Sequence, residues 1–218
     1  MRDEPVLQLS EVFYSIQGES SFAGYPCLFF RLSGCNLRCS YCDAKYTYEE
    51  PATPTAFSAL LTEAARYPNA LIEITGGEPL LQEGVYPLLE VLLARGRTVL
   101  LETNGSLSIA RVPKEVVKII DLKCPDSGMA EKMDLANLDL LGPNDEIKFV
   151  MSSRGDYDWA VAMMGKHRLA EKAKVILSPV IGRLAPALLA QWLMADALPA
   201  RLQLQLHTLL WPGVKRSV

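Results

Sequence analysis

Apolar runs rich in Val, Ile and Leu alternate with amphipathic stretches along most of the chain. The apolar runs predict strands at Cys27 to Leu32, Ala70 to Thr75, Thr98 to Thr103, Val116 to Leu122, Glu146 to Met151, Lys174 to Val180 and Arg201 to Leu206. The amphipathic stretches predict helices at Thr55 to Arg66, Gln82 to Ala94, Tyr157 to His167 and Pro186 to Ala197. This alternation is typical of parallel strands joined by crossover helices, so we expect an α/β fold.

Such a run of β-α units can close as a barrel or lie open as a doubly wound sheet, and the number of strands does not decide between them. In both architectures the loops after the carboxyl ends of the strands build the site. Here those loops are polar and rich in glycine, and they follow the strands that end near Leu32, Thr75, Thr103, Leu122 and Val180. We therefore expect a cleft at this edge of the sheet.

The 218 residues, half of them hydrophobic, suffice for one core, so we expect a single domain over residues 1–218. The net charge of -3 offers no basic face for nucleic acid. No apolar run is long enough to cross a bilayer, and the first residues lack the apolar segment of a signal peptide. We expect a cytoplasmic protein that has neither a nucleic acid nor a membrane as its partner.

Three of the five cysteines, Cys35, Cys39 and Cys42, stand at offsets of four and three residues. A four-iron four-sulfur cluster normally takes four thiolates, so a loop with three leaves one iron open to another ligand. A structural zinc site needs four ligands, but the chain has no second Cys pair and only two histidines. A ferredoxin with Cys124 as fourth ligand is a second alternative, although ferredoxins lack a large α/β domain. Cys27 lies in an apolar segment and is expected in the core.

The turn Gly76-Gly77-Glu78-Pro79 follows a predicted strand. It could be an ordinary tight connection, because glycine commonly supplies positive φ there. Beside a three-cysteine loop, however, two glycines also let backbone groups approach a ligand closely.

The cysteine spacing and this turn together resemble the radical S-adenosylmethionine (radical SAM) enzymes. The resemblance implies a partial (β/α)6-type TIM barrel of parallel strands with outer helices, and a cluster whose unique iron binds the amino and carboxylate groups of S-adenosylmethionine. One electron from the cluster then yields a 5′-deoxyadenosyl radical. By resemblance, Cys35, Cys39 and Cys42 hold the cluster, and the cofactor-binding residues are Tyr41, Asp43, Gly76, Gly77, Glu78, Glu102, Asp121, Lys123 and Ser178.

The segments Glu11 to Glu19, Phe30 to Cys35 and Gln205 to Trp211 are similar to those of one branch of these enzymes, the 7-carboxy-7-deazaguanine synthases. That resemblance implies conversion of 6-carboxy-5,6,7,8-tetrahydropterin into 7-carboxy-7-deazaguanine in queuosine and 7-deazapurine biosynthesis. The steps are hydrogen abstraction at C6, ring contraction and loss of ammonia, with S-adenosylmethionine regenerated. A flavodoxin- or ferredoxin-type reductant and a homodimer are implied as well.

Several residues suit a carboxylated pterin. Arg31 supplies a planar, permanently charged fork for the carboxylate. Gln17, Glu19 and the backbone from Ile16 to Gly18 can pair with the aminopyrimidinone edge, and Thr75 adds a hydroxyl. Position by position, a surface ion pair or an ordinary turn would explain these residues equally well. The resemblance further implies that the terminal carboxylate of Val218 reaches the substrate.

Ala44 departs from the resembled pattern, in which a Thr or Ser after Cys-Asp coordinates a magnesium ion. Alanine has no oxygen to offer, so Mg2+ would bind through substrate and water, more weakly, unless Thr47 substitutes.

Two other functions compete. A glycyl-radical-enzyme activating enzyme shares the cysteine spacing but needs a protein-docking surface, whereas Ile16 to Glu19 with Arg31 suits a small molecule. A non-catalytic iron-sulfur electron carrier has no need for the Gly76 to Pro79 turn.

Overall fold

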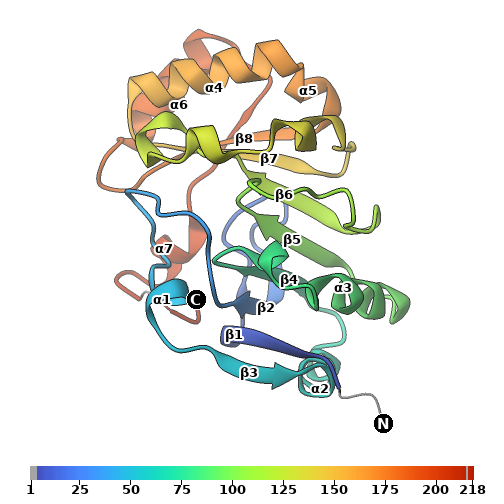
Figure 1. The fold of residues 1–218 in the computed structure, drawn as a ribbon. Coiled ribbons are helices and arrows are strands. Elements are labelled where there is room, and N and C mark those ends of the chain that lie inside the picture. Colours follow the sequence, from blue (N-terminus) through green and yellow to red (C-terminus); the bar gives the residue numbers. More distant parts are fainter. Residues whose placement is uncertain (1–3, 215) are drawn as a thin grey trace.

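The computed structural model describes residues 4–214 and 216–218, and they form one curved sheet with helices outside it (Figure 1). Nine strands lie in the order β3-β1-β2-β4-β5-β6-β7-β8-β9. Their bounds are β1 Val6–Ile16, β2 Pro26–Leu32, β3 Thr53–Ala56, β4 Leu71–Gly76, β5 Val99–Thr103, β6 Val117–Asp121, β7 Glu146–Met151, β8 Lys174–Pro179 and β9 Arg201–Leu202.

Strand β2 and strands β4 to β9 run parallel, each paired with its neighbour in the sheet. The seven strands predicted from the apolar runs are confirmed, with bounds that shift by one residue at most for the first six. The last is much shorter than predicted, because only Arg201 and Leu202 pair with β8 and residues 206–210 are helical. The fold is consistent with the expected partial barrel.

Strands β1 and β3 were not predicted, and they form an antiparallel edge next to β2. The register of β1 shifts between Leu9 and Glu11, where the strand has a bulge. Leu7 and Leu9 therefore face the main core, whereas Phe13 packs with Cys27 and Phe29 in a second cluster. A bulge interrupts the period-two pattern that identifies a strand in a sequence, which explains the omission.

The helices are α1 Tyr46–Glu49, α2 Phe57–Arg66, α3 Val85–Ala94, α4 Arg154–His167, α5 Leu169–Lys172, α6 Pro186–Ala195 and α7 Leu206–Leu210. Helix α2 begins two residues later than predicted because Thr55 and Ala56 pair with β1. Helix α4 begins three residues earlier because the Ser153 hydroxyl accepts a hydrogen bond from the Asp156 backbone N–H and caps it. Helix α3 begins three residues late, and α6 ends two residues early.

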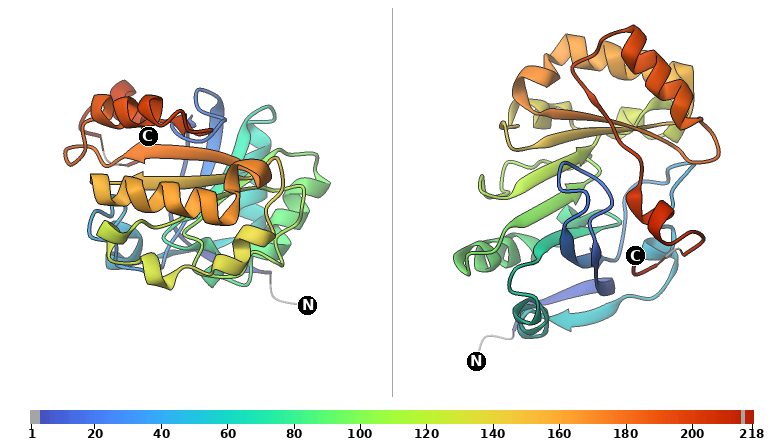
Figure 2. Two further views of the ribbon diagram at one scale, coloured as in Figure 1. Left: turned by 90° about the horizontal axis from the view of Figure 1, so that it is seen from above. Right: turned by 180° about the vertical axis from the view of Figure 1, so that it is seen from behind.

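The main core lies between the sheet and the outer helices, where α3 packs on β5, α4 on β7, and α5 and α6 on β8. Figure 1 faces the side of α3 and α4, and the view from behind in Figure 2 shows the loop between β1 and β2 and the C-terminal segment crossing the other side. Among the described residues, no helix combines the length and the apolar character that a membrane span requires.

Candidate active site

Polar side chains occupy alternate positions on six neighbouring parallel strands and share the inner face of the sheet. They are Arg31 on β2, Glu73 and Thr75 on β4, Glu102 on β5, Asp121 on β6, Glu146 and Lys148 on β7, and Ser178 on β8. The ladders place Arg31 beside Thr75 and Asp121 beside Lys148. Most of them are buried, so the inside of this sheet is a charged layer rather than a second apolar core.

Lys148 lies at the centre of this layer. Its ammonium group contacts the carboxylates of Glu19 at 2.6 Å, Asp121 at 3.7 Å and Glu102. Its side chain is only 5% exposed, so the three carboxylates replace the water that a lysine normally needs. Three strands and the loop after β1 are thereby tied together at one point.

The carboxylates of this layer differ in ionisation. Burial opposes the ionisation of Glu102, but the Lys148 ammonium outweighs it and lowers the pKa of Glu102 to about 2. Burial raises the pKa of Glu73 well above its usual value, and the charges of Glu102 and Glu19 raise it further. Burial would lower the pKa of Lys148, but Glu102, Glu19 and Asp121 raise it well above the usual value. Burial and the neighbouring charges thus move the pKa values of Glu73 and Glu102 in opposite directions.

The loop between β1 and β2 closes one end of the layer. The Gln17 amide donates to the Glu73 carboxyl, and its oxygen accepts a hydrogen bond from the Glu19 N–H at 2.7 Å. The backbone N–H and C=O of Gln17 are bonded to Tyr25 and Gly24 across the loop, and Ile16 pairs with Pro26. The Gln17 side chain and backbone therefore hold the loop in place, and this leaves fewer of their groups free for a pterin edge than predicted.

The C-terminal segment packs against the same loop, as the view from behind in Figure 2 shows. The Leu206 N–H donates to the Gly18 carbonyl at 2.9 Å, and the Gln205 amide donates to Glu19 at 2.9 Å. A Cβ on Gly18 would lie 2.5 Å from His207 Nδ1, so a larger residue here would force the His207 side chain to move. Further along, the Ser217 hydroxyl contacts Glu11, which places the neighbouring Val218 on the Arg31 side of the site.

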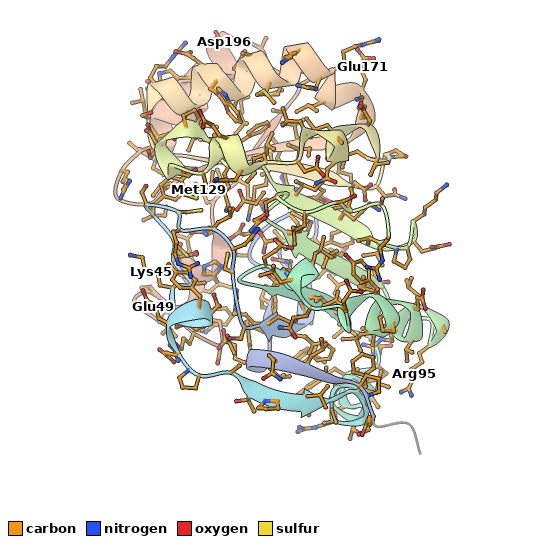
Figure 3. All side chains as sticks on the ribbon, in the orientation of Figure 1. Lys45, Glu49, Arg95, Met129, Glu171 and Asp196 are labelled. Carbon is orange, nitrogen blue, oxygen red and sulfur yellow. The ribbon has the colours of Figure 1, made fainter. Side chains whose placement is uncertain are left out.

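The cysteine loop runs from β2 to α1. The Gly34 N–H donates to the Thr47 carbonyl at 2.7 Å, and the Ser40 N–H donates to the Ser127 carbonyl at 3.0 Å. Figure 3 labels Lys45 and Glu49 at the two ends of α1 and Met129 after β6 on one side of the molecule, with Arg95, which follows α3, on the opposite side. The Arg38 N–H contacts the Met129 sulfur at 3.5 Å. The loop is therefore anchored at both ends, at the edge to which the parallel strands lead.

Cys35, Cys39 and Cys42 carry free thiols that are partly exposed. Cys39 interacts electrostatically with both of the others, and burial raises the pKa of Cys39 and Cys42. In the part of the chain that the structure describes, no three His, Cys, Asp or Glu side chains are arranged to hold one metal ion, as a zinc site requires. A cubane places each thiolate on a separate iron, so its ligands stand farther apart.

The Gly76-Gly77 turn is clamped onto the beginning of the cysteine loop. The Gly77 N–H donates to the Leu32 carbonyl at 3.1 Å, and the Glu78 N–H donates to the Gly34 carbonyl at 2.8 Å. Gly76 has φ of +145°, and a Cβ there would lie 2.2 Å from the Leu32 oxygen. A Cβ on Gly77 would lie 2.1 Å from the Gly34 oxygen and 2.8 Å from Cys35 Cβ. Both glycines are therefore required for backbone contact with this loop.

Gly77→Ala is expected to lower the free energy of unfolding by about 3 kcal/mol, because the new methyl group would overlap the Gly34 carbonyl and the Cys35 Cβ, and neither can move without the backbone. The displaced loop should also take up less iron on anaerobic reconstitution. Thermal unfolding and iron analysis measure the two effects. Gly165→Ala in α4, where a Cβ would meet nothing within 4 Å, is the matched control and should be neutral or stabilising. If the Gly77→Ala protein had the same stability and iron content as the unaltered protein, the requirement for glycine at this contact with the cysteine loop would be contradicted.

Glu78 is fully buried, and its carboxylate is used within the protein. It accepts hydrogen bonds from the Leu80 N–H at 3.0 Å, the Thr103 hydroxyl at 2.8 Å and the Asn104 N–H at 2.7 Å. This side chain therefore joins the turn after β4 to the end of β5. Its backbone N–H is bonded to the Gly34 carbonyl, so both its side chain and its N–H hold the turn in place.

The remaining predicted cofactor residues lie around the same edge. The Tyr41 hydroxyl donates to the Val150 carbonyl at 2.9 Å, which ties the cysteine loop to β7. Lys123 pairs with Asp121 at 2.6 Å, Ser178 is buried on β8, and Asp43 is exposed. The Thr75 hydroxyl donates to Glu102 at 3.0 Å. Thus the predicted site residues of β4, β5 and β6 meet in one place.

Thr47 is buried, and its hydroxyl donates to the Ala44 carbonyl at 2.8 Å. It closes the first turn of the segment after the cysteines, so the hydroxyl is already engaged by the protein. Cys27 is fully buried in the cluster with Phe13 and Phe29, as predicted. Cys124 is fully buried in the main core.

Glu11, Glu73, Asn104 and Lys148 lie at this site but were given no role from the sequence, although the loop that contains Asn104 was expected at this edge. Glu73 and Lys148 could have been recognised in the sequence, because they are charged residues within otherwise apolar strands. Each lies two positions from another polar residue, Thr75 or Glu146, and therefore on the same face of the sheet. Asn104 follows β5 directly, and its amide lies 3.8 Å from the Cys35 sulfur. Glu11 stands in the strand that the bulge obscured.

The residues fit a four-iron four-sulfur cluster with one iron open to an outside ligand. Three thiols form the donor set, and Asn104 offers an N–H to the sulfur of Cys35. One carboxylate oxygen of Asp121 is buried and has no hydrogen-bond partner within the described residues. An orphaned acceptor at this edge suits the amine or hydroxyl of a bound cosubstrate.

Comparisons with known proteins bear on the family to which the chain belongs. Residues 31–172 match the model of the radical SAM superfamily. The 7-carboxy-7-deazaguanine synthase of Chlorobaculum tepidum is 46% identical over 100% of both chains, and that of Koribacter versatilis is 43% identical over 97% of this chain and 100% of the relative.

Two solved structures share the fold. QueE from Escherichia coli has a TM-score of 0.77 at 23% identity and covers 93% of this chain and 95% of its own. Streptococcus suis SuiB bound to precursor peptide SuiA has a TM-score of 0.57 at 13% identity, covering 81% of this chain and 47% of its own. The chain therefore belongs to the 7-carboxy-7-deazaguanine synthase family of the radical SAM superfamily.

Proposed function

We propose that this enzyme converts 6-carboxy-5,6,7,8-tetrahydropterin into 7-carboxy-7-deazaguanine, with loss of ammonia, in queuosine and 7-deazapurine biosynthesis. The observation that carries this proposal is the full-length identity of 46% to a 7-carboxy-7-deazaguanine synthase. The charged layer inside the sheet supports it, because a buried layer of this kind suits a small polar substrate better than a polypeptide.

Membership of the radical SAM superfamily implies a 4Fe–4S cluster and S-adenosylmethionine. Cys35, Cys39 and Cys42 would hold the cluster, and the backbone of Gly76 to Glu78 would lie along the cosubstrate. When bound, this group supplies the one-electron chemistry that removes a hydrogen atom from the substrate. A flavodoxin- or ferredoxin-type protein is proposed as the reductant, and a cytoplasmic homodimer as the working state.

The chain's own residues would bind and orient the pterin. Arg31 offers its guanidinium to the carboxylate, and Glu19, held by Lys148 and Gln205, accepts from the amino groups of the ring. Thr75 and Glu102 line the layer between them. The loop between β1 and β2 and the C-terminal segment exclude water from this side, and the carboxylate of Val218 adds a further acceptor.

We expect turnover to depend only weakly on magnesium. Ala44 has no oxygen to coordinate the ion, and the Thr47 hydroxyl is bonded to the Ala44 carbonyl. Turnover should therefore fall only a few-fold when magnesium is removed with a chelator. Ala44→Thr should bind Mg2+ more tightly and show a steeper dependence. Complete loss of turnover of the unaltered enzyme without magnesium would contradict this expectation.

The proposed function is tested by incubating reconstituted, reduced protein with 6-carboxytetrahydropterin and S-adenosylmethionine and measuring 7-carboxy-7-deazaguanine by mass spectrometry. Product should accumulate over many turnovers. Cleavage of S-adenosylmethionine without this product would show that the protein is a radical SAM enzyme that acts on another substrate. The competing glycyl-radical activating function predicts hydrogen abstraction from a partner protein instead.

A further inference from the structure

Glu11 connects three parts of the site that are far apart in the sequence. It lies on β1 opposite Arg31 on β2 in the antiparallel ladder. Its Oε1 accepts a hydrogen bond from Arg31 Nε at 2.9 Å and one from the Tyr46 hydroxyl at 2.7 Å. Its Oε2 accepts one from the Ser217 hydroxyl at 3.1 Å. Strand β2, helix α1 and the C-terminal segment therefore meet on one carboxylate.

The contact restricts how Arg31 can be used. A guanidinium group presents its donors along distinct edges, and here the Nε–H is taken by Glu11. The guanidinium also lies 5.6 Å from the centre of the Phe13 ring. Within the described residues, the structure shows no hydrogen bond from either terminal nitrogen of Arg31. The terminal edge, with Nη1 and Nη2, is therefore the part of the group available to a ligand.

This pair differs from an ordinary surface ion pair. The side chains of Arg31 and Glu11 are only 20% and 12% exposed, so water competes little for their hydrogen bonds. Tyr46 restrains the same oxygen of Glu11 from α1, and α1 is joined to the cysteine loop because Thr47 accepts a hydrogen bond from Gly34. The orientation of Arg31 is thereby linked to the position of that loop.

We propose that Glu11 is a positioning residue that holds Arg31 by its Nε, so that the substrate carboxylate binds end-on through Nη1 and Nη2. This inference rests on the proposed function and adds to it the binding mode of the carboxylate. Glu11 itself does not touch the substrate. Its effect is confined to ligands that carry the carboxylate, since a pterin without that group has nothing to offer Arg31.

The test compares two ligands on two variants. Binding of 6-carboxytetrahydropterin and of tetrahydropterin, which lacks the carboxylate, is measured anaerobically by calorimetry on reconstituted protein with S-adenosylmethionine. Glu11→Ala should weaken binding of the carboxylated pterin about tenfold, which corresponds to about 1.4 kcal/mol. It should change binding of tetrahydropterin by less than about twofold. In turnover, KM should rise by a similar factor while kcat changes little.

Glu11→Gln guards against a folding defect, because the amide keeps an acceptor for Arg31 and Tyr46 in the same shape. Glu11→Gln should weaken binding of the carboxylated pterin less than Glu11→Ala does. It should again leave binding of tetrahydropterin unchanged. If either substitution weakened binding of both pterins equally, Glu11 would have a purely structural role and the inference would be overturned. Unchanged or tighter binding of the carboxylated pterin to Glu11→Ala would overturn it as well. If the unaltered enzyme bound neither pterin, the proposed function itself would fail.

Discussion

Cys39→Ala is expected to abolish both the iron cluster and the cleavage of S-adenosylmethionine. The loop supplies only three thiols, and Cys39 interacts with both of the others, so its loss leaves two ligands for a cluster that needs three. Anaerobic reconstitution followed by iron and sulfide analysis and visible absorption measures the cluster. Formation of 5′-deoxyadenosine on reduction measures the cleavage.

Cys27→Ala is the matched control, because Cys27 is a buried cysteine packed against Phe13 and Phe29. It should retain the cluster and the activity and lose about 1 kcal/mol of stability from the smaller side chain. A Cys39→Ala protein that kept its full iron content would show that the ligands lie elsewhere. Loss of iron in the Cys27 variant without loss of folding would point to the same conclusion.

Lys148→Met is expected to have the second largest effect. Methionine leaves Glu102, Glu19 and Asp121 around an apolar side chain, and breaking a buried charge pair in this way costs about 3–5 kcal/mol. Turnover should also fall by about a hundredfold, because Glu19 and Glu102 lose the group that fixes their positions. Chemical denaturation and product assays measure the two effects.

Lys118→Met is the matched control, since Lys118 and Asp145 form a buried ion pair at 3.1 Å outside the charged layer. It should lose stability without a comparable loss of turnover per folded molecule. If both variants lost turnover equally, Lys148 would have a structural role only.

The stability difference between the unaltered protein and Lys148→Met should depend on pH. The pKa of Glu102 is about 2 in the folded protein, below its usual value of 4.5, so the full stabilisation from its pairing with Lys148 is present above pH 4.5. The contribution is lost as the pH falls from 4.5 toward 2. The difference measured in denaturation of the iron-free proteins should therefore be largest near neutral pH and shrink in that acid range. A difference that stayed constant would argue against the pairing.

The parallel strands and the edge that carries the site follow from simple patterns in the sequence. Runs such as Glu146 to Met151 are short, apolar and separated by helical stretches, and the loops after them contain Cys35, Gly77 and Asn104. Because carboxyl ends of parallel strands meet at one edge, these residues could be brought together without coordinates. The six strands that confirm this pattern, β2 and β4 to β8, differ from prediction by one residue at most at either end.

The antiparallel edge and the connections inside the site could not be found in the same way. The bulge between Leu9 and Glu11 moves the side chains of β1 from one face to the other, so no single period describes the strand. The Glu11 side chain contacts Ser217, which is 206 residues later in the sequence, and Glu19 contacts Lys148, which is 129 residues later. Such pairings depend on how the strands and the C-terminal segment pack, and no local pattern specifies them.

The same holds for Gln17 and Glu78. The family resemblance implies a cofactor contact for Glu78, and the chemistry of a pterin edge suggests a substrate contact for Gln17. In the structure Gln17 bonds to Glu73 and to the loop backbone, and Glu78 bonds to Leu80, Thr103 and Asn104. Buried polar groups need partners, and a turn close to several free N–H groups supplies them.

The central claim, that the enzyme removes a hydrogen atom from C6 of the pterin and regenerates its cosubstrate, is tested most directly with substrate deuterated at C6. The reconstituted, reduced enzyme should form 7-carboxy-7-deazaguanine while deuterium appears in recovered S-adenosylmethionine, which is not consumed in proportion to product. Product formed without transfer of deuterium, or S-adenosylmethionine consumed without product, would contradict the account.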